Sequence, residues 1–281
     1  MDEILPLYKS WGIAGIKFGF VQVGSQVWTK WMHEAVKKCA DYGLMVDIHD
    51  EYRPTGFSRT YPNLMTQEGI RGNEEFPDAI HNVTLPFTRF VAGAADYTIC
   101  YYRQDFGRLN TDKDNYGVPR SKSIQTTPAH QLAAVYYSPL QYMYWYDKPS
   151  DSQDEPELKF FDDIYTTWDD TKVLQGEIGQ FITIARRKGE EWFIGSITNN
   201  EARALPVSLD FLPEGKNYVA EIYTDGERSI KTRTKVKCSR YRVNSMTKLN
   251  FELKASGGSA VRLIPEKDVN KKLGNYKKQK L

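Results

Sequence analysis

The chain of 281 residues is poor in the residue types that mark metal-binding and disulfide-rich proteins. Its three cysteines, Cys39, Cys100 and Cys238, are too few and too scattered for a disulfide framework or a zinc site. None of its four histidines is paired at a spacing typical of a histidine-based metal centre. A net charge of +2 gives no indication of nucleic-acid binding. No apolar run reaches the length of a membrane-spanning helix, so we expect no membrane span.

The composition is that of a globular protein with a sizeable core. Hydrophobic residues make up 40% and charged residues 26%, which predicts one large domain or two smaller ones. Aromatic residues are abundant at 13%. Aromatic faces often bind the apolar face of a sugar ring, but a tyrosine-rich β-structure would give the same composition.

The first 170 residues alternate between strand and helix patterns. Residues 13–20 predict a strand, 25–42 a helix with Ser25 as its N-cap and Gly43 at its end, and 44–49 a second strand. Such a βαβ unit predicts a parallel sheet. The pattern continues with a helix over 84–94, a strand over 97–101, a helix from Pro128, a strand over 141–146 and a helix from Pro156. We expect an α/β fold, with 1–170 forming half of an eight-stranded (β/α)8 TIM-type barrel.

The pattern changes to short alternating runs after about residue 168. Strands are predicted over 181–187, 192–198, 218–224 and 259–264, with further alternation over 207–211 and 249–253. Lys188 and Gly189 predict a hairpin turn. We therefore expect an all-β antiparallel sandwich over 171–266. Residues 267–281 carry six lysines, which favours a basic disordered tail over a binding patch.

One loop after the strand over 44–49 concentrates titratable side chains. It reads HDEYRPTG over 49–56, RTYPNL over 59–64 and EGIRGNEEF over 68–76. A loop of this kind at the end of a buried strand is typical of a functional site. The alternative is a solvated loop whose acidic residues cap helices.

These segments resemble the catalytic loop of glycoside hydrolase family 97, the α-glucosidase and α-galactosidase type. The resemblance extends over about the first 265 residues and includes GIKFGF, LPFTRFVAGAADYT and WDDTKVLQGEIGQFITIARRKGEEWFIGSITNN. It implies an O-glycosyl hydrolase that acts on α-linked oligosaccharides. Family members are usually exported, so the resemblance implies a periplasmic or secreted protein. They are also much longer, and the chain, which starts without a signal peptide, is expected to lack an N-terminal half that other members carry.

The resemblance also assigns roles to acidic residues. Glu74 matches the general acid, whose pKa the nearby Glu68 and Glu75 would raise by charge repulsion. Glu68 matches a calcium ligand, and Glu68 and Glu74 are the candidate metal ligands of a calcium site that is expected to be incomplete in this chain. Asp50 falls where inverting members have a carboxylate base; the alternative is a structural role.

Three further residues are candidate sugar ligands. By the two-residue period of a strand, Lys17 shares a face with Gly19, and His49 shares one with Asp47. Lys17 is expected to bind a sugar hydroxyl and pair with Asp47, or else to form only a buried structural ion pair. Arg53 either clamps a substrate group or fixes the loop.

Gly19 is a departure from the family pattern. Retaining members have an aspartate nucleophile at this position, and glycine has no nucleophilic group. Either the second carboxylate comes from elsewhere, with Asp50 as the local candidate, or the chain is a non-catalytic carbohydrate-binding remnant or a gene fragment of such an enzyme.

Overall fold

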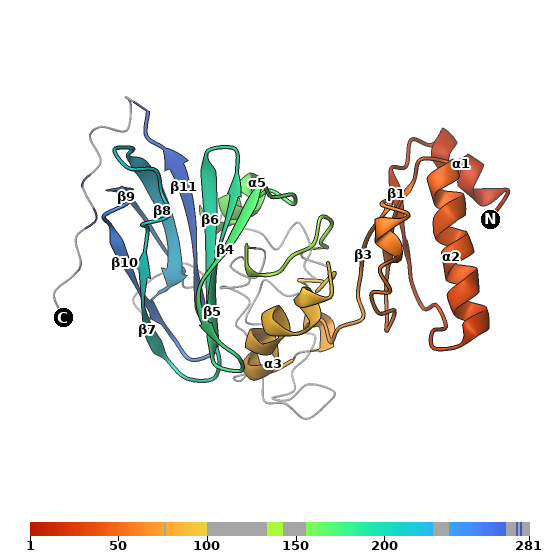
Figure 1. Ribbon diagram of the computed structural model, residues 1–281, viewed down its shortest axis with the longest axis horizontal. Helices are drawn as coiled ribbons and strands as arrows, with labels where there is room; N and C mark the ends of the chain where they lie inside the picture. The colour runs from red at the N-terminus through yellow and green to blue at the C-terminus, as the bar shows by residue number, and fades with distance from the viewer. Residues whose placement is uncertain are drawn as a thin grey trace.

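The computed structural model describes residues 1–75, 77–99, 134–142, 156–226 and 236–267, together with Gly274 and Tyr276. An α/β region lies at one end of the long axis and an antiparallel β region at the other (Figure 1). Most of the helix predicted from Pro128 and most of the strand predicted over 141–146 lie outside the described residues. Ala134 and Val135, at the end of the predicted helix, are described and are helical, whereas Gln141 and Tyr142 are described and are not in a strand.

The predicted βαβ unit is confirmed. Strands β1 (Gly15–Phe18) and β2 (Met45–Ile48) are parallel and are connected by helix α2 (Gln26–Asp41). Ser25 is the N-cap of α2, and its side chain accepts a hydrogen bond from the backbone N–H of Trp28 at 3.2 Å. Gly43, with φ of +65°, allows the chain to turn from α2 into β2. A short helix, α1 (Ile4–Ser10), precedes β1.

A third parallel strand, β3 (Leu64–Gln67), extends the sheet to the order β1-β2-β3. The sequence analysis placed these residues in a loop. A four-residue strand is too short to show a period, and the polar residues around it hide its apolar start. On one face of the sheet, α1 and α2 cover a core of apolar side chains that includes Val36, Cys39, Val46, Ile48 and Leu64.

The segment after β3 is made of short helical turns. It contains η2 (Asn73–Glu75), α3 (Ala79–Thr84), η3 (Leu85–Phe87) and η4 (Arg89–Val91), and a further turn, η1 (Phe57–Arg59), lies between β2 and β3. The helix predicted over 84–94 is wrong, because Pro86 supplies no N–H for a continuing helix and Thr88 leaves the helical region. The predicted strand is not formed over 97–99 either, because Thr98 has φ of +53°.

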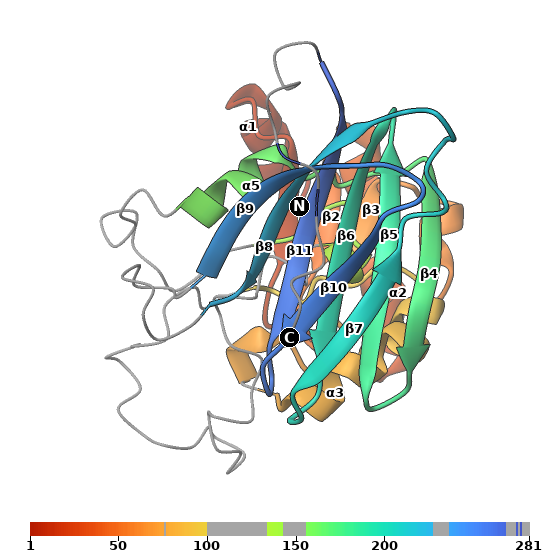
Figure 2. The same ribbon diagram turned by 90° about the vertical axis from the view of Figure 1, so that its left-hand side faces the viewer.

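The antiparallel β region follows η8 (Pro156–Leu158) and α5 (Lys159–Asp163). Its strands are β4 (Asp170–Glu177), β5 (Phe181–Lys188), β6 (Glu191–Thr198), β7 (Arg203–Ser208), β8 (Tyr218–Asp225), β9 (Val236–Val243), β10 (Lys248–Leu253) and β11 (Gly258–Pro265). They form a six-stranded sheet of order β4-β5-β6-β11-β8-β9 and a two-stranded sheet of β10 and β7 (Figure 2). No helix occurs among the described residues of 180–264, as predicted.

Both faces of the six-stranded sheet are covered. One face packs against β7 and β10 around a core that includes Ile194, Val207, Phe251 and Val261. On the other face, Ile182, Ile184 and Ile197 pack against side chains of α3 and of residues 135 and 136. Arg186 ties the same face to residues 134 and 135 by donating hydrogen bonds to their two carbonyl groups. The segment after β3 is thus anchored on the β region.

Two residues of the predicted disordered tail are packed on the β region. Gly274 and Tyr276 form backbone hydrogen bonds with Arg242 at the edge of β9, with N–O distances of 3.0 Å. The Tyr276 hydroxyl accepts a hydrogen bond from the N–H of Asn250, and its ring contacts Tyr241. The lysine-rich composition of the tail did not predict this contact, because a single aromatic side chain, that of Tyr276, makes it.

Candidate functional site

A break in register between β2 and β3 decides which side chains face the candidate site. Leu64 pairs with Val46 on the helix-covered face, but the next aligned pair is Asp47 with Thr66. The extra residue in β3 reverses the alternation, so Thr66 and then Glu68 lie on the opposite face of the sheet from Leu64. Without this bulge, Glu68 would share the face of Leu64. The bulge therefore brings Glu68 to the side of His49.

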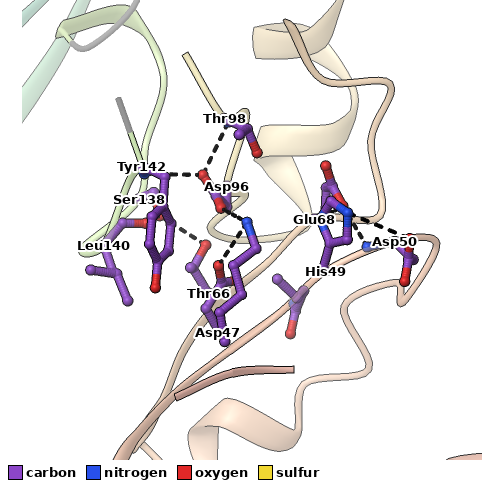
Figure 3. Close-up of polar contacts among 12 residues, drawn as sticks. Asp47, His49, Asp50, Thr66, Glu68, Asp96, Thr98, Ser138, Leu140 and Tyr142 are labelled. Atoms are coloured by element: carbon purple, nitrogen blue, oxygen red, sulfur yellow. Dashed lines mark hydrogen bonds and ion pairs between the residues drawn. The ribbon is translucent and has the colours of Figure 1, made fainter. Parts of the chain in front are cut away.

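His49, Asp50 and Glu68 form a compact cluster where β2 and β3 end (Figure 3). His49 Nδ1 lies 2.6 Å from Glu68 Oε2, and His49 Nε2 lies 3.6 Å from Asp50 Oδ1. The backbone N–H of Asp50 also donates to Glu68 Oε2. The bond to Glu68 raises the pKa of His49 against the opposing effect of burial. The cluster lies at the carboxyl ends of parallel strands, where barrel enzymes place functional groups.

The backbone holds Asp50 in an unusual conformation. Its φ is +64°, in the left-handed region, which costs free energy for a residue other than glycine. The Asp50 carbonyl accepts a hydrogen bond from the N–H of Gly69 at 2.8 Å, which stabilises this turn. Asp50 Oδ2 is buried and has no hydrogen-bond partner in the described part of the chain. An unsatisfied buried carboxylate oxygen suits a bound cation or a sugar hydroxyl.

A second polar cluster lies one layer below the first on the same face. Lys17 Nζ is 2.5 Å from Asp96 Oδ2 and 3.3 Å from Asp47 Oδ2, and both aspartates are fully buried. Burial and repulsion from Asp96 raise the pKa of Asp47. Burial alone would lower the pKa of Lys17, but the two carboxylates more than reverse this effect. The predicted pair of Lys17 with Asp47 is thus present, with Asp96 as an additional partner.

Residues distant in sequence surround this lower cluster. The hydroxyls of Thr66 and Ser138 are 2.8 Å apart, and Asp96 Oδ1 accepts hydrogen bonds from the N–H groups of Thr98 and Tyr142 (Figure 3). The Lys17 ammonium lies 4.6 Å from the centre of the Tyr142 ring. Sequence reasoning missed Asp96, although it belongs to the segment LPFTRFVAGAADYT, because its distance from Lys17 along the chain gives no spacing signal.

The structure brings together four of the six candidate residues. Lys17, His49, Asp50 and Glu68 lie on one side of the sheet, whereas Arg53 is exposed and forms no hydrogen bond or ion pair with any described residue. The backbone of Glu74 belongs to η2, but its side chain lies outside the described atoms. The assignment of Glu74 as an acid therefore stays a prediction.

Gly19 lies beside the upper cluster and has space around it. The nearest atom to the position of an added Cβ is His49 Cδ2, at 4.0 Å, and Gly19 is not among the glycines with positive φ. An L-residue can therefore occupy this position without strain. Glycine here is not required by the backbone.

Two family models cover most of the chain. Residues 1–70 match the model of glycoside hydrolase 97, and residues 167–264 match the model of the glycosyl-hydrolase 97 C-terminal, oligomerisation region. The chain belongs to glycoside hydrolase family 97. The first match contains Gly19, His49, Asp50, Glu68, Lys17 and Asp47. Asp96 and Glu74 lie between the two matched ranges.

Similar proteins span more sequence than this chain. It is 34% identical over 274 residues to a retaining alpha-galactosidase of Bacteroides thetaiotaomicron, covering 94% of this chain and 40% of the relative. It is 30% identical over 211 residues to a probable retaining alpha-galactosidase of Streptomyces bingchenggensis, covering 74% of this chain and 31% of the relative. A family 97 enzyme from Pseudoalteromonas sp. strain K8, solved with acarbose, is 28% identical with a TM-score of 0.81, covering 95% of this chain and 44% of the enzyme. The chain thus spans less than half of these relatives.

Proposed function

We propose that the protein containing this chain hydrolyses α-linked glycosides, galactosides or glucosides, with its reaction centre at the His49, Asp50 and Glu68 cluster. The observation that carries the proposal is the convergence of these three side chains at the carboxyl ends of two parallel strands in a family 97 chain. Hydrolysis of a glycosidic bond needs one carboxylic acid and one carboxylate. We assign Glu74 as the acid and Asp50 as the carboxylate that acts on water.

The histidine and the strained turn fit this assignment. Glu68 holds His49 through Nδ1, which leaves Nε2 directed towards Asp50 at 3.6 Å. The positive φ of Asp50 is held by the hydrogen bond from Gly69, so its carboxylate has a fixed position for a water or a sugar hydroxyl. Lys17, one layer lower, keeps 12% of its side chain exposed, and we assign it to binding a sugar hydroxyl. Arg53 is exposed, and we assign it a contact with the substrate in the complete protein.

Calcium fits the oxygen atoms of this cluster. The carboxylates of Glu68 and Asp50 are hard ligands of the type calcium prefers, and Asp50 Oδ2 has no other partner among the described residues. The histidine nitrogen is not a usual calcium ligand, and we assign it to orienting Glu68. Glu74, the other residue predicted as a ligand, is assigned as the acid and not as a ligand, because a carboxylate bound to calcium would not carry the proton that the leaving oxygen needs. When bound, calcium would add positive charge where the leaving oxygen develops negative charge.

We also propose that an N-terminal part completes the site. Strand β1 pairs only with β2 in the described part of the chain, so its other edge is open. Half of a (β/α)8 barrel would have such an edge, to be covered by the strands of the other half. The coverage of 40% of the Bacteroides relative agrees with such a missing part.

The test replaces the proposed acid in the complete protein. Glu74→Gln is expected to lower hydrolysis of a natural α-linked disaccharide by about 10²- to 10⁴-fold, because a sugar alkoxide leaves poorly without a proton. An aryl glycoside with a good leaving group should be affected less. Glu51→Gln, at an exposed glutamate of the loop that follows β2, is the matched control. Equal effects of the two substitutions would reject the assignment.

The absence of a carboxylate at Gly19 favours a second candidate function, a non-catalytic carbohydrate-binding remnant. The same preparation separates the two proposals. Calorimetric binding of an α-galactoside or α-glucoside without any hydrolysis would support the remnant, whereas turnover that is lost in Glu74→Gln supports the hydrolase.

A further inference from the structure

Arg89 is surrounded by backbone carbonyl groups. Its Nε donates to the carbonyl of Gly69 at 3.1 Å, and its Nη1 donates to that of Gly93 at 3.2 Å. Its Nη2 lies within 3.0 to 3.2 Å of three more carbonyls, those of Gln67, Glu68 and Ala94. No carboxylate lies within ion-pair distance of this guanidinium among the described residues. The chain thus uses an entire arginine side chain to bind main chain only.

The five carbonyls belong to the two segments that supply the polar clusters. Residues 67–69 carry Glu68, whose carboxylate binds His49 and the N–H of Asp50. Residues 93 and 94 lie three and two positions before Asp96, which binds Lys17. The two segments also touch each other, because the N–H of Asp96 donates to the carbonyl of Gln67 at 3.2 Å. Arg89 therefore fixes the relative position of the upper and lower clusters.

Electrostatics explains why a cation is needed there. Three consecutive carbonyl groups that converge on one point repel each other, and in a half-buried place water cannot replace the missing donors fully. Burial lowers the pKa of Arg89 to about 10, so the group keeps its charge at neutral pH. A planar guanidinium has five N–H donors in a fixed arrangement, whereas a lysine ammonium has three around one point. Only arginine matches this set of acceptors.

We propose that Arg89 is a positioning residue that holds the Glu68 segment in register with His49 and Asp50. This proposal rests on the proposed hydrolase function for its catalytic consequence, but not for its structural one. Small displacements of reacting groups lower rates strongly, so loss of Arg89 should reduce turnover more than substrate affinity.

Arg186 supplies a matched control. It is also an arginine bound to backbone carbonyls, those of Ala134 and Val135, with a third bond to the hydroxyl of Thr171. Burial also lowers its pKa to about 10. It lies between the β region and residues 134 and 135, and contacts neither Glu68 nor His49. Arg89→Met and Arg186→Met therefore remove the same side chain with the same kind of bonding from two places.

Hydrogen exchange measured by mass spectrometry tests the structural part. The N–H groups of Glu68 and Gly69 bond to Ile48 and Asp50, so they report on this segment. Arg89→Met is expected to accelerate exchange over 64–70 by about tenfold or more, with no change over 191–198. Arg186→Met should accelerate exchange around 134–136 and 181–187 only. Equal exchange over 64–70 in the two variants would overturn the proposal.

Kinetics of the complete protein tests the catalytic part. Arg89→Met is expected to lower kcat by about 10²-fold with KM changed by less than about threefold, whereas Arg186→Met changes neither. Arg89→Lys keeps the charge but not the geometry, and an intermediate kcat is expected; it also replaces Arg89→Met if that variant does not fold. Equal losses of kcat in the Arg89 and Arg186 variants would overturn the proposal. If the wild type hydrolyses no α-glycoside, the proposed function fails, and hydrogen exchange alone decides whether Arg89 positions the segment.

Discussion

Glu68 binds His49 through the same oxygen that accepts the backbone N–H of Asp50. His49 Nδ1 is 2.6 Å from that oxygen, and the Glu68 carboxylate is almost completely buried. One carboxylate thus fixes a side chain from β2 and the turn that follows it. This relationship makes the cluster sensitive to pH, because its strength depends on the charge of the imidazole.

The first prediction concerns stability against pH. The folded-state pKa of His49 is raised above 6.5, so protonated His49 stabilises the fold. This contribution is complete below the unfolded pKa and is lost as pH rises through the folded pKa. The loss of unfolding free energy caused by Glu68→Gln should therefore be larger at pH 6 than at pH 9 in urea denaturation. An equal loss of unfolding free energy at pH 6 and pH 9 would contradict the His49 interaction. NMR titration of the histidines gives an independent measurement.

The second prediction concerns Gly19. Gly19→Asp is expected to raise glycosidase activity in the complete protein, because it restores a carboxylate on the face of Lys17 and next to His49. A Cβ added at Gly19 would lie 4.0 Å from His49 Cδ2, and the φ of Gly19 is not positive, so the aspartate side chain has space. Gly19→Asn has the same size without the charge and is the control. If the aspartate has no effect while sugar still binds, the binding-remnant proposal is favoured.

The third prediction concerns the lower cluster. Lys17→Met leaves the buried carboxylates of Asp47 and Asp96 without their cation, and it should lower the free energy of unfolding by about 3 to 5 kcal/mol. Adding Asp96→Asn should recover part of this loss. Lys37→Met is the control, because Lys37 and Glu34 form a pair on the surface with half-exposed side chains, and such a pair contributes little to stability. Urea denaturation measures all four proteins; similar losses in the two lysine variants would disprove the role of burial.

The fourth prediction concerns the tail. Tyr276→Ala should destabilise the β region by about 1 to 3 kcal/mol, because it removes a ring that packs against Tyr241 and the core between the sheets. Tyr276→Phe removes only the hydroxyl that binds Asn250 and should cost about 1 kcal/mol. Removal of 268–281 should also uncover the edge of β9 and increase self-association in sedimentation velocity experiments. Unchanged thermal melts for Tyr276→Ala would show that the tail contact contributes nothing.

The elements with strong local signals could be predicted from the sequence. The Ser25 cap, the apolar period of α2 and Gly43 predicted a helix that the structure has at Gln26–Asp41, because caps and periods act within a few residues. Alternating strands around Lys188 and Gly189 likewise predicted the hairpin of β5 and β6. The two-residue period also placed Lys17 and Asp47 together, since they are register partners in adjacent strands.

The assembly of the site could not be predicted in this way, because it depends on contacts between distant segments. The bulge between β2 and β3 places Glu68 beside His49, although the simple alternation from Leu64 would place it on the other face. Asp96 binds Lys17, which lies 79 residues away along the chain, and no sequence pattern indicates this contact. The bonds from Arg89 to five carbonyl groups are likewise not indicated by any pattern. Local propensities determine helices and turns. A one-residue change in register and the contacts between distant segments depend instead on the packing of the whole chain, and they determine which charged side chains meet.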